Sequence, residues 1–316
     1  MTTSRAVVAR LALALATLAG CSSEPEPHVP QESPSLDGIA IFPADNPWNT
    51  RVDGEPVDAN SDAIIAGIGL DTPLHADFGA DWNGGPFGIP YVVVGGGQPL
   101  VPLSFEYADE SDPGPYPIPP DAPIEGGVHS EGDRHILVVD RDARRLYEIF
   151  AAYPDGNGWR AGSGAVFDLT SNALRPAGWT SADAAGLPIL PGLARYDEAV
   201  SPEGIRHALR FTARRTRRAY VSPARHFASS STDPALPPMG MRVRLKASVD
   251  LTDFPPQARA VLTALRTYGM LLADNGSDWY ISGAPDARWS DDDLRALARI
   301  TGRDLEVVRM GPLTTE

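Results

Sequence analysis

The sequence has very little cysteine: Cys21 is the single one among 316 residues. One cysteine excludes disulfide bonds within the chain and any metal or redox site built from several thiols. The signature motifs of several enzyme classes are missing as well. There is no H-E-x-x-H, no G-x-S-x-G, no Walker loop and no G-x-G-x-x-G after a predicted strand. The sequence therefore gives no indication of a zinc peptidase, an α/β-hydrolase or a nucleotide-binding enzyme.

Positive charge is also scarce. The chain has 27 Lys and Arg against 41 Asp and Glu, which gives a net charge of −14 at pH 7. Nucleic acids and anionic lipid surfaces bind clusters of positive charge. We therefore expect no nucleic-acid partner.

Long apolar runs are absent too. The run at residues 11–18 is shorter than the roughly 20 apolar residues that span a bilayer. Arg5 and Arg10 precede it, as a positive segment precedes the apolar part of an export signal. Residues 18–21, Leu-Ala-Gly-Cys, then resemble the lipobox of bacterial lipoproteins.

This resemblance implies that residues 1–20 are a cleaved signal peptide and that Cys21 is the acylated N-terminus. The partner would be a lipid bilayer, and the location the extracytoplasmic face of the cell envelope. The two or three acyl chains of this class, palmitate among them, anchor a protein firmly. Residues 21–37 are mostly Ser, Glu, Pro and Gln, so we predict a disordered tether there and a single β-rich domain over residues 38–316.

Strand patterns dominate this domain, because Gly and Pro are each near one residue in ten and helical spacing is rare. Helices are predicted at residues 58–68, 256–268 and 290–300. Strands are predicted at residues 89–94, 134–140, 146–153, 159–169, 205–212, 217–221, 241–247, 270–273 and 279–282. Turn residues predict hairpins at residues 141–144 and 274–278. Many short strands and few helices predict an all-β fold, a β-sandwich or jelly-roll-like core with a few peripheral helices.

One long segment, residues 162–198, combines an irregular latter part with many aromatic and charged side chains. A loop of this length in a compact domain is usually functional or disordered, and its Trp, Leu, Ile and Tyr argue against disorder. We predict that residues 172–198 form one wall of the main cleft, with His207 and Arg210 on its floor. A structural loop whose Arg and Asp satisfy buried backbone groups is the open alternative.

The candidate residues follow from this segment. The predicted catalytic residues are Asp183, Asp197 and His207, with Glu148 and Glu198 as further carboxylates. The predicted substrate-binding residues are Trp179, Arg175, Arg195, Tyr196, Arg210 and His226. Asp197 and Glu198 are adjacent, so in an extended segment they point to opposite faces and only one can line a groove. His207 and Arg210 also face opposite ways in a strand, and we expect His207 to reach the ligand.

Three short runs give a second resemblance: residues 42–49, residues 172–188 and residues 207–211. They resemble a family of exported bacterial proteins that is uncharacterised, and the likeness extends over residues 42–308. It implies one intact domain and brings no activity or catalytic residues with it.

Three functions stay open. The first is a carbohydrate-active hydrolase that uses paired carboxylates on a neutral or weakly charged polysaccharide. The second is a non-catalytic lipoprotein that binds a glycan or another part of the envelope. The third is a polysaccharide lyase with His207, Arg210, Arg225 and His226 as its residues. No histidine spacing is diagnostic of a metal site and helix-dipole capping explains the aspartates at 291–293, so neither a metal nor another cofactor is predicted.

Overall fold

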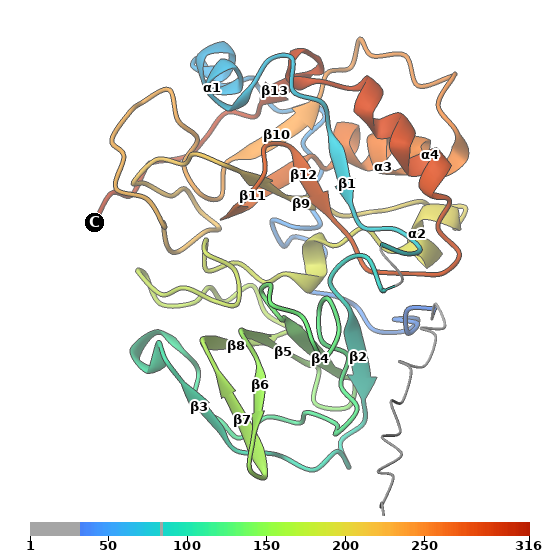
Figure 1. The fold of residues 1–316 in the computed structure, drawn as a ribbon. Coiled ribbons are helices and arrows are strands. Elements are labelled where there is room, and N and C mark those ends of the chain that lie inside the picture. Colours follow the sequence, from blue (N-terminus) through green and yellow to red (C-terminus); the bar gives the residue numbers. More distant parts are fainter. Residues whose placement is uncertain (1–31, 83–84) are drawn as a thin grey trace, which may run out of the picture.

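The computed structural model describes residues 32–82 and 85–316 of the chain (Figure 1). The predicted signal peptide, Cys21 and most of the predicted tether lie outside these residues. Within them, no helix is both long enough and apolar enough to cross a bilayer. The described chain is mostly β, with three sheets and four short α-helices, and this confirms the prediction of an all-β fold with few helices.

The largest sheet has six strands and lies in the upper half of Figure 1. In spatial order its strands are β1 (His75–Asp77), β12 (Tyr280–Ser282), β9 (Leu209–Ala213), β11 (Met270–Asn275), β10 (Arg242–Leu245) and β13 (Leu305–Val307). Helix α3 (Pro256–Thr267) packs against β10, and α1 (Ser61–Ile68) packs beside β13. In α3, Ala258, Val261, Leu262 and Leu265 recur at helical spacing and all four are buried.

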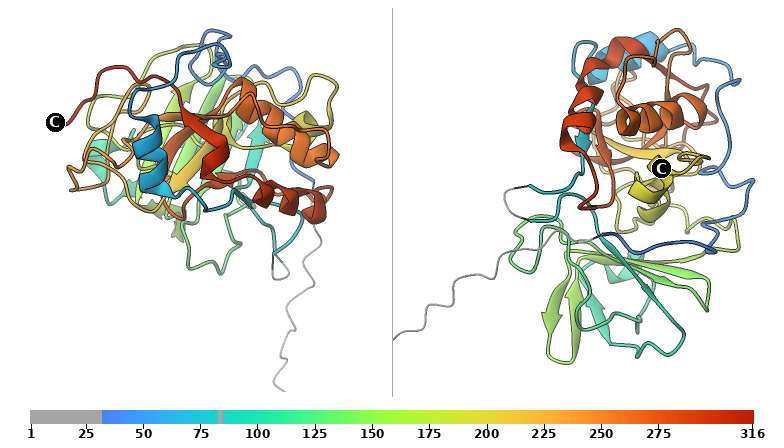
Figure 2. Two further views of the ribbon diagram at one scale, coloured as in Figure 1. Left: turned by 90° about the horizontal axis from the view of Figure 1, so that it is seen from above. Right: turned by 90° about the vertical axis from the view of Figure 1, so that its right-hand side faces the viewer.

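The two smaller sheets lie in the lower half of the molecule (Figures 1 and 2). One contains β2 (Tyr91–Val94), β4 (Ile136–Asp140), β5 (Arg145–Phe150) and β8 (Ser163–Asp168), and the other contains β3 (Leu103–Phe105), β7 (Gly158–Ala161) and β6 (Tyr153–Asp155). Ile136 and Val138 of β4 join one apolar core, and Leu137 and Val139 join the other. Because side chains alternate along a strand, this fully buried strand serves both cores at once.

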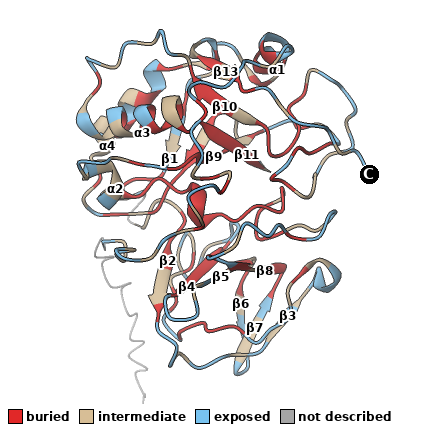
Figure 3. Ribbon diagram, turned by 180° about the vertical axis from the view of Figure 1, so that it is seen from behind, coloured by how far each residue is buried: buried red, intermediate tan, exposed pale blue. Residues whose placement is uncertain are grey.

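The segment predicted as a site loop runs between the halves (Figures 1 and 3). Its residues 181–195 are almost all buried, whereas residues 172–180 are mostly exposed. Its backbone N–H groups bind both neighbouring sheets. Ala185 N–H donates to Ala273 O of β11, and Ala194 N–H donates to Ser282 O of β12. On the other side, Ile189 N–H donates to the Glu148 carboxylate of β5 at 2.8 Å. The segment is therefore the central layer of the fold.

Several local predictions are confirmed. Strands β4 and β5 pair antiparallel as the predicted hairpin, with Ile136 opposite Ile149. Helix α4 (Asp291–Arg295) begins at Ser290, whose Oγ accepts the N–H of Asp293 at 3.2 Å, and it continues as a 3-10 turn (Ala296–Arg299).

Other local predictions are wrong. Strands β11 and β12 do not form a hairpin with each other, because β9 lies between them, parallel to β11 and antiparallel to β12. The predicted strand at 159–169 divides at Gly162 into β7 and β8, which belong to different sheets. The predicted strand at 217–221 is reduced to isolated bridges of Tyr220.

Residues 196–200 were not predicted to be regular, yet they form the short helix α2 (Tyr196–Val200). Asp197 and Glu198 therefore do not alternate along an extended segment. Glu198 turns inward to a buried arginine and histidine, and Asp197 is about half exposed.

The described end of the predicted tether lies against the domain. Ser33 N–H donates to Asp286 Oδ2 at 3.0 Å, and Ser33 Oγ–H donates to Pro285 O at 2.6 Å. The hydroxyl of Tyr91 donates to Pro34 O at 2.6 Å, and Leu36 packs against the main core. The domain therefore begins at about residue 33, a few residues earlier than the sequence predicted.

Candidate functional site

The predicted site residues fall around two separate cavities. The first, here called the Asp274 cavity, has a volume of about 480 Å³. It is lined by Asp183, His226 and Asp274, together with Tyr107, Glu110, Asp133, Phe150, Thr180 and Asn275. The second, here called the His207 cavity, has a volume of about 730 Å³ and is lined by Arg195, Tyr196, Asp197, Glu198 and His207. The structure thus does not bring Asp183 and Asp197 together as two carboxylates of one groove.

Asp183 and Arg210 form a buried ion pair beside the Asp274 cavity. Arg210 Nε donates to Asp183 Oδ2 at 2.7 Å, and Arg210 Nη2 donates to Asp183 Oδ1 at 2.5 Å. Its Nη1 donates to Ser282 Oγ on β12. Each guanidinium nitrogen therefore has a partner, and the side chain is only 6 % exposed and lines neither cavity, so Arg210 orients Asp183 instead of reaching a ligand.

Asp274 completes this group from the neighbouring strand. Its carboxylate lies 3.8 Å from Arg210 Nη2, at a point where the register of β11 against β9 shifts. Burial, and then the charge of Asp183, raise the pKa of Asp274 to about 8, and the two carboxyl groups share a hydrogen bond. Asp274 is therefore a protonated acid at neutral pH, and about a quarter of its side chain is exposed.

His226 lines the same cavity from the loop after residue 221. Its Nδ1 donates to Ala184 O at 2.7 Å, which leaves Nε2 as the lone-pair nitrogen in the neutral ring. Nε2 has no hydrogen-bond partner among residues 32–82 and 85–316. Asn275 Nδ2 donates to Ala228 O at 3.0 Å, so this loop is fixed to the end of β11 that carries Asp274.

Arg175 and Trp179 support the cavity wall. Arg175 is buried, and its guanidinium donates to Thr180 O at 2.8 Å, to Glu110 O at 2.9 Å and to Asp112. The Trp179 ring is 5.5 Å from the Arg175 guanidinium. Arg175 therefore holds residues 110 and 180, which line the cavity, while its own buried side chain does not line it.

Glu148 has a comparable role below the central segment. Its buried carboxylate accepts the backbone N–H groups of Ile189 and Leu190 at 2.8 and 2.9 Å. Burial raises the pKa of Glu148 to about 7, although these two hydrogen bonds oppose the rise. Glu148 lines neither the Asp274 cavity nor the His207 cavity.

The His207 cavity contains a polar network, in which the buried Arg195 Nε has no hydrogen-bond partner within the described residues. Arg195 Nη2 donates to Glu198 Oε1 at 2.6 Å and to His207 Nε2 at 2.9 Å. Glu198 Oε2 lies 3.0 Å from the same His207 nitrogen, and His207 Nδ1 lies 2.8 Å from Ala208 O. Burial alone would raise the pKa of Glu198, but Arg195 and His207 lower it to about 2. Asp197 lies at the rim and pairs with Arg288 at 2.9 Å.

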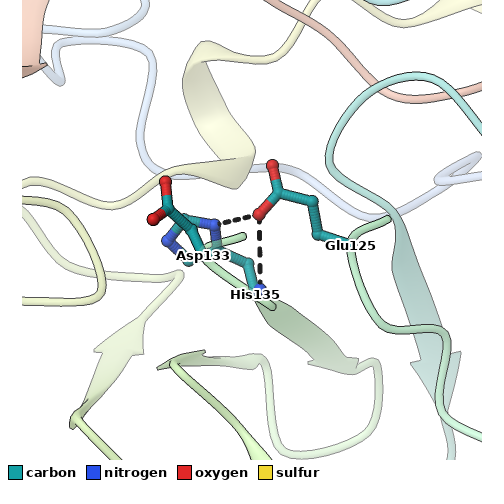
Figure 4. Close-up of side chains that lie close together, drawn as sticks. All are labelled: Glu125, Asp133 and His135. Atoms are coloured by element: carbon teal, nitrogen blue, oxygen red, sulfur yellow. Dashed lines mark hydrogen bonds and ion pairs between the residues drawn. The ribbon is translucent and has the colours of Figure 1, made fainter. Parts of the chain in front are cut away.

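A third polar group, Glu125, Asp133 and His135, adjoins the Asp274 cavity through Asp133 (Figure 4). His135 Nδ1 lies 2.6 Å from Glu125 Oε2, and His135 Nε2 lies 3.0 Å from Ala182 O. Burial disfavours a charged ring, but the Glu125 carboxylate outweighs burial and raises the pKa of His135 to about 9.

The sequence analysis did not identify Asp274 as a site residue, and it did not identify Glu125 and Asp133 as partners of His135. Asp274 was interpreted as a turn residue, because Asp-Asn-Gly is turn chemistry wherever it occurs. No local signal distinguishes a turn aspartate from one that shares a proton with a residue 91 positions earlier in the chain. Asp133 and His135 lie two positions apart in the sequence, but their partner Glu125 lies in a proline- and glycine-rich stretch.

Comparison of the chain with family models, with curated proteins and with solved structures finds no match. The resemblances to bacterial lipoproteins and to exported bacterial proteins therefore stay predictions.

Proposed function

We propose that this protein is a lipid-anchored extracytoplasmic hydrolase that cleaves a glycan by acid–base catalysis in the Asp274 cavity. The observation that carries the proposal is the pKa of Asp274, raised to about 8 inside a cavity beside the buried Asp183–Arg210 pair. A carboxyl group that keeps its proton at neutral pH is what a general acid requires, and such groups concentrate at active sites.

The base is His226. In the neutral ring Nδ1 carries the proton and Nε2 can accept one, so the cavity contains a group that donates a proton and a group that can accept one. In the proposed reaction Asp274 donates its proton to the glycosidic oxygen, and the bond from that oxygen to the anomeric carbon breaks. Water attacks the anomeric carbon and gives a proton to His226 Nε2, so that one water molecule is consumed.

A glycan substrate agrees with the predicted cellular location of the protein and with the side chains that line the cavity. The lipobox resemblance at Cys21 predicts a location among envelope polysaccharides. The cavity presents the aromatic faces of Tyr107 and Phe150 next to the polar groups of Thr180 and Asn275. Sugars combine apolar ring faces with hydroxyl groups, and mixed linings of this kind supply partners for both.

The test is reducing-end release from a panel of neutral and weakly charged glycans by the full mature chain. We expect Asp274→Asn to lower kcat by about 10²–10⁴-fold, the usual contribution of a general acid. His226→Asn should give a loss of similar size, because an asparagine amide can keep the bond to Ala184 O but has no counterpart of Nε2. The matched control is Asp121→Asn, an exposed aspartate that lines neither cavity.

Two results would contradict the proposal: no release from any glycan of the panel, or undiminished turnover in Asp274→Asn. A lyase reaction is not proposed, because Arg210 is buried against Asp183 and Ser282 and lines neither cavity, where a uronate would bind.

The His207 cavity supports a second candidate, non-catalytic glycan binding. Its charged groups Arg195, Glu198 and His207 bind one another, and the aromatic rings of Tyr91 and Tyr196 lie in its wall. Arg206 is exposed at this cavity and has no hydrogen-bond partner in the described chain. Titration calorimetry and turnover assays with the same glycans separate the candidates. A glycan-binding protein loses affinity in Arg206→Ala and keeps it in Asp274→Asn. A hydrolase keeps its turnover in Arg206→Ala and loses it in Asp274→Asn.

A further inference from the structure

Three metal-ligating side chains lie close together, those of Glu125, Asp133 and His135. They take no part in the proposed hydrolysis. One ligand atom from each residue can be chosen so that all three lie within 4.8 Å of one another. Figure 4 shows the three side chains beside one another, with Glu125 bound to the ring of His135. Their burial differs: His135 is 2 % exposed, Glu125 is partly buried and Asp133 is exposed.

The orientation of His135 is that of a metal ligand. Metal-binding histidines usually donate the second ring N–H to a carboxylate or a backbone carbonyl, which fixes the tautomer and the ring plane. His135 Nε2 lies 3.0 Å from Ala182 O, a backbone carbonyl, so Nδ1 is the nitrogen that would bind an ion, after releasing to solvent the proton that it directs at Glu125. Nδ1 is also the nitrogen that lies 2.6 Å from Glu125 Oε2.

The backbone around this group is held in place before any ligand binds. Glu125 N–H donates to His135 O at 3.0 Å, which ties the two residues together. Between Asp133 and His135, the buried Arg134 donates to Ala152 O at 3.0 Å and to Val128 O and Ser130 O at 2.9 Å. A site with a fixed backbone loses little conformational entropy when it binds an ion.

The distances need only a small adjustment. A tetrahedral ion about 2.1 Å from each donor sets the donor atoms about 3.4 Å apart. The Glu125–His135 contact of 2.6 Å would open by about 0.8 Å, and the widest separation, at most 4.8 Å, would contract by up to about 1.4 Å. The Asp133 side chain makes no hydrogen bond within the described residues, so it is free to make this movement.

We propose that Glu125, Asp133 and His135 bind one divalent transition-metal ion through two carboxylate oxygens and His135 Nδ1. One imidazole nitrogen with two carboxylate oxygens is a donor set for Zn²⁺ or Mn²⁺, since purely oxygen sites suit Mg²⁺ and Ca²⁺. Three protein ligands leave at least one position for water or a ligand, as in catalytic zinc sites. Asp133 lines the Asp274 cavity, so that open position adjoins the same cavity as Asp274 and His226.

The experiment is calorimetric titration of the full mature chain with ZnCl₂, and electron paramagnetic resonance with Mn²⁺. We expect one ion per chain in the wild type. Asp133→Asn and Glu125→Gln should each weaken binding at least tenfold, whereas Asp121→Asn should bind as the wild type does. Thermal melting provides a second readout: an ion that binds the folded state raises the Tm of the wild type and leaves that of Asp133→Asn unchanged.

Asp133→Asn is the decisive variant, because it leaves the Glu125–His135 pair intact and should not affect folding. If that pair is only structural, Zn²⁺ will not bind stoichiometrically, and this result overturns the proposal. Binding that persists equally in Asp133→Asn and Glu125→Gln would place the ion elsewhere on the acidic surface and would overturn it too. Both readouts measure binding and not turnover, so the result does not depend on the hydrolase proposal.

Discussion

Arg210 binds both carboxylate oxygens of Asp183, at 2.5 and 2.7 Å, in the buried layer between the two halves of the molecule. The same guanidinium lies 3.8 Å from Asp274, so one cation stands beside two carboxyl groups. One charge can fully compensate only one of them. This explains why burial and the neighbouring carboxylate raise the pKa of Asp274 in spite of the nearby guanidinium.

The raised pKa of Asp274 predicts a pH-dependent stability. Between the ordinary value of 3.8 and about 8, the folded chain keeps a proton at Asp274 that the unfolded chain loses. The stabilisation is therefore complete below about pH 4 and is lost as the pH rises to about 8. Urea unfolding of wild type and Asp274→Asn at pH 5, 7 and 8.5 measures this. The variant, which has no such proton, should gain stability relative to the wild type as the pH rises, and a constant difference would contradict the assigned protonation.

Replacing Asp183 should strongly lower the free energy of unfolding. Asp183→Asn leaves the Arg210 guanidinium buried without its main counter-charge, which typically costs about 3–5 kcal/mol. Asp197→Asn is the matched control, because Asp197 is about half exposed and its partner Arg288 also pairs with Asp286 at 2.7 Å. That change should cost less than about 1 kcal/mol. Equal losses of unfolding free energy in the two variants would argue against the buried pair.

The beginning of the domain can be tested by truncation. Removal of residues 22–31 leaves the Ser33 bonds to Asp286 and Pro285 intact, so the Tm should stay within about a degree. Removal of residues 22–36 deletes those bonds and the packing of Leu36, and should lower the Tm by several degrees, since about 1 kcal/mol corresponds to a few degrees in a domain of this size. Identical melting curves would show that residues 33–36 contribute nothing to the domain.

Lipidation is predicted from the resemblance at residues 18–21. Cys21→Ala should prevent incorporation of labelled palmitate and leave the protein as an unprocessed precursor or absent from the membrane fraction. Cys21→Ser offers a closer control for side-chain size and should behave in the same way. Equal labelling of wild type and both variants would rule out the lipoprotein assignment.

Local patterns determined much of the secondary structure. The spacing of Ala258, Val261 and Leu265 predicted α3, and the polar turn at residues 141–144 predicted the β4–β5 hairpin, because helix faces and tight turns depend on residues a few positions apart. Composition also predicted the β-rich fold and the scarcity of helices. The sequence predicted that residues 172–198 form either a wall of the main cleft or a structural loop, but not that they lie between two sheets.

Only the tertiary structure decided which strands pair and which polar residues meet. The turn at residues 274–278 has hairpin chemistry, yet β9 lies between β11 and β12, because the pairing that buries Leu209 and Phe211 outweighs a local turn preference. That insertion brings Arg210 to Asp274, and the central segment brings Asp183 to both. A pKa depends on burial and on charges a few ångströms away. Asp274 is 64 positions from Arg210 and 91 positions from Asp183 in the sequence. The acid of the proposed site can therefore be identified only from the folded structure.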